Sequence, residues 1–245
     1  MVIKKSLPTT AVISILSILL FSFEPSASQK EEPIAKAVAD YLVAGRAVVA
    51  KTQPLINDPS KGYKGFTPDA YAEQVREVFK VMTGMDVKTL SLSDPMGKAL
   101  IDLHESAKEA VADAQVQINE HGKAFKGFIP AVFGERTANI FYRKSMIRIK
   151  QTSLKFRGDY NEPDEFEAAI LKKFESGWEK GRPYFEVITV RDRQVARYML
   201  PVYITRECLS CHGEPAGELD IAGKRKEGYK EGDLRGAISV KVPVK

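Results

Sequence analysis

The stretch Gly236-Ala-Ile-Ser-Val-Lys-Val-Pro-Val244 alternates apolar with other side chains and places Ile238, Val240 and Val242 on one face. Such a period of two is typical of a half-buried β-strand. The same alternation occurs in three earlier stretches, at 146–154, 184–190 and 195–204. Asp192-Arg193 joins the last two of these as a turn. Residues 146–245 are therefore predicted to form a small α+β domain with a largely antiparallel sheet.

Helical periodicity dominates the preceding part of the chain, residues 29–145. It predicts helices over 31–53 and 71–82, the second ending near Gly84. Ser93-Asp94-Pro95 is a helix-start signal, and apolar residues follow it at helical spacing as far as Ile118. Within the strand-rich part, Asn161-Glu-Pro-Asp164 predicts one more helix, which runs to about residue 174.

Part of the helical region is repeated. The segments 53–68 and 115–130 align without a gap at an offset of 62 residues, and eight of the sixteen positions are identical. Both contain Lys-Gly-Phe-x-Pro, which we interpret as a tight turn in a duplicated helix–loop–helix unit. Either the two loops are purely structural, or the aromatic loop of the second copy covers a cofactor.

The N-terminus has the layout of a secretory signal peptide. Lys4 and Lys5 precede an apolar run, and Ser26-Ala27-Ser28 supplies the small residues of a cleavage site. The apolar run is shorter than the ~20 residues that a membrane-spanning helix needs. We therefore expect cleavage of residues 1–28, a periplasmic or otherwise exported protein, and no stable membrane insertion afterwards.

Charge and composition exclude some classes of function. The net charge is only +5, and 28% of the residues are charged, with bases and acids interspersed along the chain. This distribution indicates a solvated surface and argues against a nucleic-acid partner.

Both cysteines lie in one motif, Cys208-Leu-Ser-Cys211-His212. Cys-x-x-Cys-His is the attachment signature of c-type haem. Two thiols at this spacing can add to the two vinyl groups of the porphyrin, and the adjacent histidine can then bind the iron as proximal ligand. We predict one covalently attached haem c.

Three other interpretations of the motif remain open. A thiol–disulfide redox pair would ordinarily have a thioredoxin-like βαβ context, which we do not find around Cys208. A zinc site needs four ligands, and only His104 and His121 could add to the motif. The third alternative is an inert structural disulfide.

Further sequence motifs resemble those of a known protein family. Thr152-Ser-Leu-Lys155-x-Arg157, then Asn161-x-Pro-Asp164-x-Phe-Glu167, then the motif with Gly213 and the stretch 236–240, look like the signature of the Tll0287-like family. That family comprises exported haem c proteins and sensor ectodomains. The resemblance implies a PAS-like antiparallel sheet that carries haem c, flanked by helices.

The chain departs from the family pattern in two places. It has Arg157-Gly-Asp-Tyr-Asn161 where the family usually has Arg-Asn-Pro-x-Asn. Some members are described as using a helix cysteine as second axial ligand, whereas this chain has no third cysteine. The sixth position must therefore take another partner or stay open to water or a small ligand.

Several residues are candidates for the rest of the site. His121 stands in the second repeat loop between aromatic residues and is our candidate distal ligand; His104, a methionine, Lys51 or an open site are the alternatives. Lys155 and Arg157 are candidates for pairing with the haem propionates, since a carboxylate favours a nearby Arg fork or Lys charge.

Two classes of function follow. The first is a monohaem cytochrome that transfers electrons to an unknown redox partner protein. The second is a haem-based redox or small-ligand sensor domain that acts through a partner. We do not expect an enzyme, although weak peroxidase-like activity stays open, as does a homodimer.

Overall fold

The computed structural model describes residues 27–244. Most of the predicted signal peptide, residues 1–26, lies outside the described residues. The helices are α1 (Ala27–Lys51), α2 (Gln53–Ile56), α3 (Pro68–Thr83), α4 (Pro95–Asp113), α5 (Gln115–Ile118), α6 (Pro130–Ser145), α7 (Glu165–Glu175) and α8 (Leu209–His212). The strands are β1 (Arg148–Thr152), β2 (Tyr184–Val190), β3 (Arg193–Tyr203) and β4 (Leu234–Pro243).

The four strands of the described region form one antiparallel sheet in the order β1-β4-β3-β2. The last strand of the chain is thus inserted between the first and the third, and Ile238 pairs with Gln151 on one side and Leu200 on the other. Arg191 and Asp192 adopt positive φ in the β2–β3 turn, as a tight hairpin turn requires. The predicted α+β class and antiparallel sheet are confirmed; the PAS-like character of the sheet stays a prediction.

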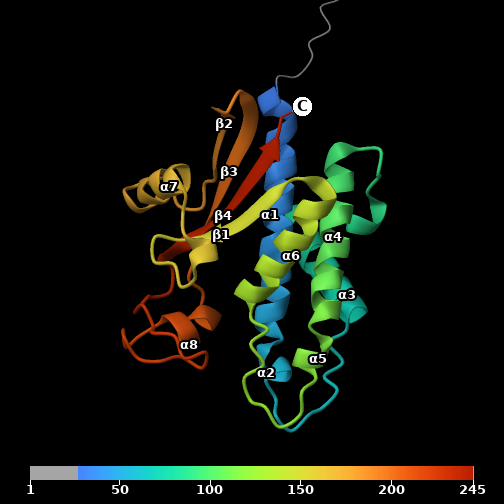
Figure 1. The fold of residues 1–245 in the computed structure, drawn as a ribbon, viewed down its shortest axis with the longest axis vertical. Coiled ribbons are helices and arrows are strands. Elements are labelled where there is room, and N and C mark those ends of the chain that lie inside the picture. Colours follow the sequence, from blue (N-terminus) through green and yellow to red (C-terminus); the bar gives the residue numbers. More distant parts are fainter. Residues whose placement is uncertain (1–26, 245) are drawn as a thin grey trace, which may run out of the picture.

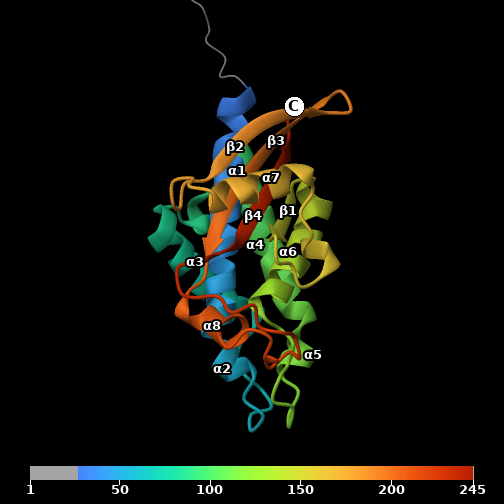
Figure 2. The same cartoon turned by 90° about the vertical axis from the view of Figure 1, so that its left-hand side faces the viewer.

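The two faces of the sheet are covered differently. Helix α1 runs along one face against β3 and β4, and α7 lies on the other, as Figures 1 and 2 show. The alternation in β4 decides which side chain meets which helix: Ile238 and Val240 belong to the cluster that includes α1, whereas Ala237 packs with Met199 and the apolar residues of α7. The α7 helix begins as predicted, with Asp164 and Glu167 in a reciprocal capping box.

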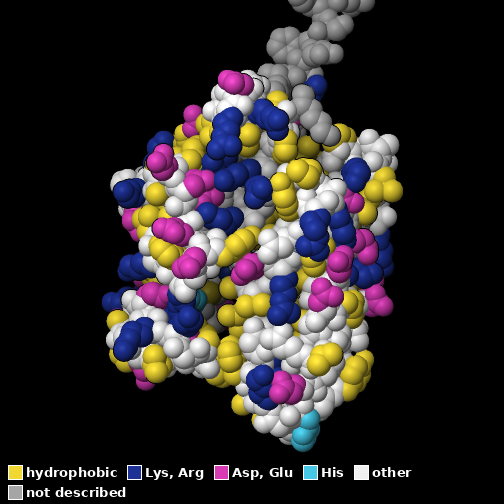
Figure 3. Space-filling model, viewed as in Figure 1, with side chains coloured by type: hydrophobic (Ala, Val, Ile, Leu, Met, Phe, Trp, Pro, Cys, Tyr) yellow, Lys and Arg dark blue, Asp and Glu magenta, His cyan; other side chains and the backbone are white. Residues whose placement is uncertain are grey.

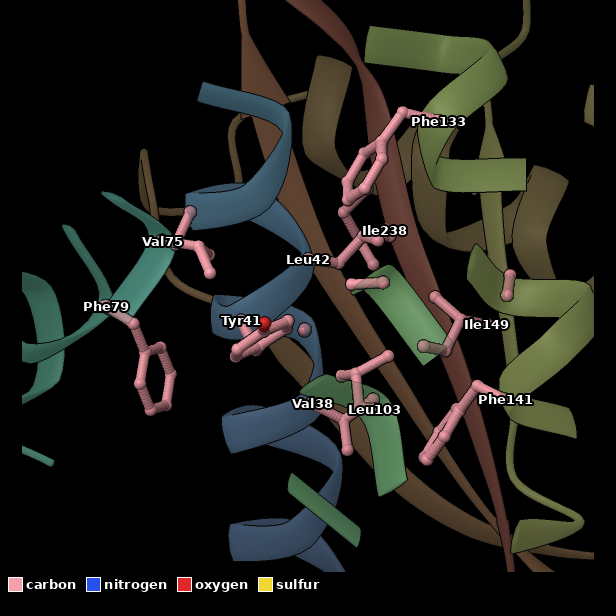
Figure 4. Packing of buried hydrophobic residues seen from close by; sticks show 14 of the residues in the cluster. Val38, Tyr41, Leu42, Val75, Phe79, Leu103, Phe133, Phe141, Ile149 and Ile238 are labelled. Atoms are coloured by element: carbon pink, nitrogen blue, oxygen red, sulfur yellow. The ribbon is translucent and has the colours of Figure 1, made fainter. Parts of the chain in front are cut away.

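Helix α1 contributes to the main hydrophobic core from several sides. Figure 4 shows Leu42 near Ile238 of the sheet, with Phe79 of α3 on the opposite side of α1. The same cluster contains buried residues of α3, α4, α6 and the sheet, so helices and sheet share one core. The predicted boundary between residues 145 and 146 falls between α6 and β1; the division into domains stays a prediction.

The duplication extends further than the sequence alignment indicated. At the offset of 62 residues, α2 and α3 correspond to α5 and α6 at both ends, and α1 ends where α4 ends. The ion pair Lys36–Asp40 recurs as Lys98–Asp102. The repeated unit is therefore a whole helical hairpin, whose helices have diverged because their apolar faces meet different neighbours.

The residues that are identical between the two loops hold the loops to each other. Gln53 Nε2 donates to the Phe128 carbonyl at 2.9 Å, and Gln115 Nε2 donates to the Phe66 carbonyl at 3.0 Å. Asn119 Oδ1 accepts from the Lys64 backbone N–H at 2.8 Å. Its counterpart, Asn57 Oδ1, accepts from the Lys126 N–H at 2.9 Å. The two loops lie side by side at the lower end of Figures 1 and 2, and this reciprocal pairing gives the identical Gln and Asn residues a structural role.

Replacing Asn119 by Ala should destabilise the protein by about 1–3 kcal/mol, because the backbone N–H of Lys64 would lose its acceptor in a partly buried place. Asn57→Ala should have a similar effect, since it removes the equivalent bond. Urea denaturation measures both. Val116→Ala is the control, because this side chain is 89% exposed and its loss should change stability by less than ~0.5 kcal/mol. Equal stability of Asn119→Ala and the control would contradict the pairing.

Candidate functional site

The motif lies in residues 205–233, which connect β3 to β4; we call this segment the motif lobe. A short 3₁₀ turn, η3 (Arg206–Cys208), leads into α8. The ends of the lobe are joined by hydrogen bonds between Ile204 and residues 232 and 233, so the lobe leaves and re-enters the sheet at one point. Because β3 and β4 are paired neighbours, this fixes the lobe at the end of the sheet, next to the lower half of α1 in Figure 1.

Both thiols are available for chemistry. Cys208 and Cys211 are free cysteines and partly exposed. Cys208 is the N-cap of α8 and Cys211 lies in it, so the two side chains are three residues apart on one helical turn. Side chains at this spacing share a face of the helix. Thr205 Oγ1 lies 3.4 Å from Cys208 Sγ, and Ser210 Oγ donates to Cys211 Sγ at 3.8 Å.

His212 is oriented by a carboxylate. Its Nδ1 lies 2.8 Å from Glu227 Oε2, which leaves Nε2 for another partner. Burial lowers the pKa of His212 below its ordinary value, and the charge of Arg235 lowers it further, against the opposing effect of Glu227. The imidazole is therefore neutral near pH 7, with Nδ1 carrying the proton that it donates to Glu227. This is the state in which a histidine binds a metal, and a carboxylate on the other ring nitrogen is the usual support of such a ligand.

Arg157 organises the lobe around this pair. Its Nε and Nη2 donate to the two carboxylate oxygens of Glu227 at 2.6 and 2.7 Å, and Nη1 donates to Asp220 Oδ2 at 2.6 Å. Nη2 also donates to the backbone carbonyl of Cys211 at 2.6 Å. Burial opposes ionisation of Glu227, but the bonds from Arg157 and His212 outweigh it and lower its pKa to about 2. Arg157 thus ties the cysteine motif to the rest of the lobe.

The two residues predicted to bind propionates lie beside the motif, but in different situations. Lys155 is exposed, and its Nζ lies 5.0 Å from the centre of the Tyr229 ring. The Tyr229 backbone N–H donates to the His212 carbonyl at 2.9 Å, so Lys155 stands next to the motif. Each nitrogen of the Arg157 guanidinium already donates within the lobe, so a propionate would share this group with Glu227, Asp220 and the Cys211 carbonyl.

The structure does not bring the other two histidines to the motif. His121 is exposed in the loop between α5 and α6, at the end of the molecule where the two repeat loops pair. His104 lies in α4, with Nδ1 2.8 Å from the hydroxyl of Tyr41, and burial lowers its pKa. With this hydrogen bond, His104 has a structural role as a partly buried residue of α4.

Sequence reasoning missed several residues of the site. Glu227 and Asp220 stand among many charged residues of the lobe, and nothing in their spacing distinguishes them. Arg235, at the start of β4, lies within 3.9 Å of Glu227 and donates to Ser153 Oγ at 2.7 Å. Only the folded arrangement reveals these neighbours.

Two negative findings concern residues 27–244. Among them, no group of three or more His, Cys, Asp or Glu side chains could hold a metal ion, so the zinc interpretation gains no support. None of the helices described there is long and apolar enough to cross a membrane.

Fold and site together define an α+β protein in which an antiparallel sheet, covered by a duplicated helical hairpin, carries a Cys-x-x-Cys-His lobe. The model of the Tll0287-like family matches residues 24–243, and the chain belongs to this family. This confirms the resemblance inferred from the motifs. No curated protein matches the chain.

One solved structure is similar, described as the crystal structure of the cyanobacterial heme-protein Tll0287. The sequences are 18% identical, the match covers 60% of this chain and 94% of the other, and the TM-score is 0.42.

Glu227→Gln should remove a pH-dependent part of the stability. The pKa of Glu227 is depressed in the folded state, so its ionised form stabilises the fold above the unfolded pKa near 4.5, and this contribution is lost as the pH falls towards 2. At pH 6 the variant should be less stable by on the order of 1–2 kcal/mol, and the difference should shrink steadily below pH 4.5. Urea denaturation at several pH values measures it.

Glu218→Gln is the matched control in the same lobe. Glu218 is half exposed and pairs with Lys226 at the surface, so its loss should change stability by less than ~1 kcal/mol. A Glu227→Gln variant that differs from wild type equally at pH 6 and pH 3 would disprove the role of the Glu227 charge.

Proposed function

We propose that the protein is an exported c-type cytochrome that carries one haem on Cys208, Cys211 and His212 and transfers electrons. The observation that carries this proposal is the pairing of His212 Nδ1 with Glu227, beside two free thiols on one helical turn. Redox thiols are activated by charged groups such as His⁺, whereas burial keeps this imidazole neutral while Glu227 orients it, and a structural disulfide needs no such imidazole.

The residues present fit a covalently held haem. The thiols of Cys208 and Cys211 would form the thioethers, and His212 Nε2 would be the proximal ligand. The haem would supply an iron that changes its oxidation state by one electron. Glu227 accepts a hydrogen bond from His212 and so makes the imidazole a stronger donor, which favours the oxidised iron. Arg157 holds Glu227 in place, so the ligand keeps its direction when the charge of the iron changes.

The comparisons agree with this proposal in general terms. The solved relative is described as a haem protein, a description that concerns that protein. For this chain the covalent attachment rests on its own motif. Export rests on the sequence of the N-terminus, and the partner in electron transfer would be another exported redox protein.

A second candidate function is a haem-based sensor of redox state or of a small ligand. It is favoured by the positions of the remaining imidazoles: His104 is bonded to Tyr41, and His121 is exposed in a distant loop. If neither residue reaches the iron, the sixth position is left to a methionine, to Lys51 or to an exogenous ligand, and the last case would make the protein a sensor. Two strong protein ligands would favour electron transfer, and an open position would favour sensing.

Expression with a haem c maturation system should give a protein whose mass, after acid–acetone extraction, equals the polypeptide plus one haem. Cys208→Ser and Cys211→Ser should lose covalent haem or hold it through a single thioether, because each removes one attachment point. Ser210→Ala is the control, since it lies between the cysteines and should leave the haem mass unchanged. A wild-type mass equal to the bare polypeptide would refute the proposal.

Spectra of the same samples decide between the two functions. A reduced protein that stays low-spin and does not react with CO has two protein ligands and supports electron transfer. A reduced protein that binds CO has an open or weakly held position and supports the sensor. His121→Ala, which should leave both spectra unchanged if the exposed loop stays away from the iron, tests the predicted distal ligand.

A further inference from the structure

Residues 217–226 form a β-hairpin within the motif lobe, with Leu219 opposite Arg225. Backbone hydrogen bonds of 2.8 to 2.9 Å join its two arms. At the turn, the carboxylate of Asp220 accepts from two further backbone N–H groups, one of them that of Lys224, at 2.8 and 2.9 Å. The hairpin is therefore braced by its own backbone and by a side chain at its turn.

Asp220 decides which side of the hairpin faces the motif. This residue is 8% exposed, and its Oδ2 accepts from Arg157 Nη1 at 2.6 Å. Arg157 Nη2 in turn donates to the Cys211 carbonyl at 2.6 Å. Neighbouring side chains of an extended arm point to opposite sides, so Leu219 points away from Arg157. Leu219 and Ile221 are 60% and 61% exposed, and both are available to a partner.

Two basic residues lie on the same hairpin as this apolar pair. Lys224 and Arg225 are exposed, and neither forms an ion pair within the part of the chain that the structure describes. The two carboxylates of the hairpin are already paired, one with Arg157 and one with Lys226. The hairpin therefore presents two uncompensated positive charges together with two exposed apolar side chains.

This combination of groups is typical of an interaction surface. Figure 3 shows hydrophobic and basic side chains next to one another on the lobe, at the lower left. Exposed apolar residues that stand singly are common on any protein, whereas neighbouring ones with a polar rim mark places where a partner binds. Apolar contact supplies affinity, and fixed charges steer a partner of the opposite sign towards the surface. The partner that fits is therefore acidic.

We infer that the hairpin 217–226 is the docking site of an acidic electron-transfer protein. This inference rests on the proposed function for the chemistry of the partner. Two consecutive hydrogen bonds of Arg157 join the hairpin to Cys211, so a protein docked there stands next to the motif. One electron passes between the cofactor of the partner and the haem iron, and no covalent bond forms or breaks.

The test replaces Lys224 and Arg225 together by Glu in haem-loaded protein. The probe is reduced flavodoxin, a small acidic flavoprotein, whose flavin gives one electron to the oxidised haem. At low ionic strength the second-order rate constant should fall about tenfold, because the reversed charges repel the probe. At roughly 0.5 M salt the difference should shrink to less than threefold, since salt screens exposed charges. Stopped-flow absorption measures the rate.

The matched control is Arg191→Glu with Arg193→Glu. These exposed residues lie where β3 begins, whereas the lobe follows the end of this strand of 11 residues. About 33 Å of strand thus separates the control from the lobe, and its rate constant should change by less than about twofold. Hexaammineruthenium(II), a small cation that also gives one electron, should reduce the hairpin variant no more slowly than the wild type. Equal flavodoxin rates for the hairpin variant and the control overturn the inference.

Replacing Leu219 and Ile221 together by Ser tests the apolar part. The flavodoxin rate constant should fall about threefold at low and at high salt, because apolar contact is not screened. Two results would assign this pair to another occupant and overturn the inference. A changed haem absorption spectrum means that the haem covers the pair. A wild-type dimer in sedimentation that this variant dissolves means that a second copy does.

A second variant keeps the charge test open if the first does not fold, as judged by circular dichroism. Lys224→Gln with Arg225→Gln then takes its place. It removes the two charges without reversing them, and the low-salt rate constant with flavodoxin should fall about threefold.

The outcomes separate the docking site from the proposed function. A wild type with covalent haem that flavodoxin reduces as fast as the Lys224→Glu, Arg225→Glu variant overturns the docking site alone. A wild type without covalent haem defeats the proposed function, and docking is then measured by calorimetric titration with oxidised flavodoxin at low ionic strength. Binding that the charge-reversed variant weakens supports the surface, and no binding to the wild type overturns it.

Discussion

The guanidinium of Arg157 donates to two carboxylates and to the backbone carbonyl of Cys211, and the geometry of the candidate site depends on this set of bonds. The motif lobe is a long connection with little regular structure, so it has few ladder hydrogen bonds of its own to hold it. Arg157 replaces them by joining the end of α8 to residues 220 and 227. Glu227 then stays ionised despite burial and directs the His212 ring. Without Arg157, Asp220 would keep only its backbone donors and Glu227 would keep only His212 and the more distant Arg235, so the carboxylate that directs the His212 ring would be held less firmly.

The sheet makes this arrangement possible by bringing distant segments to one place. Because β4 lies between β1 and β3, the chain that follows β1 and the chain that precedes β4 meet at the same end of the sheet. Arg157 comes from the first and Glu227 from the second, 70 residues apart. Helix α1 packs on β3 and β4, so the helical region lies beside the two strands that the lobe connects. A shared core between helices and sheet therefore has a functional consequence: it sets the distance between α1 and the lobe.

Local sequence patterns predicted most of the fold and, within the site, the Cys-x-x-Cys-His motif. The alternation around Ile238, the helix start at Asp94 and the cap at Asp164 all depend on neighbours within a few residues, and the structure has each element close to its predicted place. The extent of the duplication was underestimated, because helix surfaces diverge while the paired loops keep Gln53, Asn57 and their counterparts. The partners of His212 and the role of Arg157 could not be predicted, since they depend on contacts across 15 and 70 residues that leave no period in the sequence.

Arg157 and Arg46 differ in how far the protein chain satisfies their hydrogen-bond donors. The Arg157 side chain is 20% exposed, and its Nε, Nη1 and Nη2 each donate to an acceptor of the same lobe. Arg46 is held on a rigid helix with a buried Nε that no described residue accepts from. Most buried polar groups in natural proteins have a partner, and the bonds of Arg157 follow this rule. The geometry of the motif therefore depends on Arg157, which bonds both the Cys211 carbonyl and the carboxylate that directs His212.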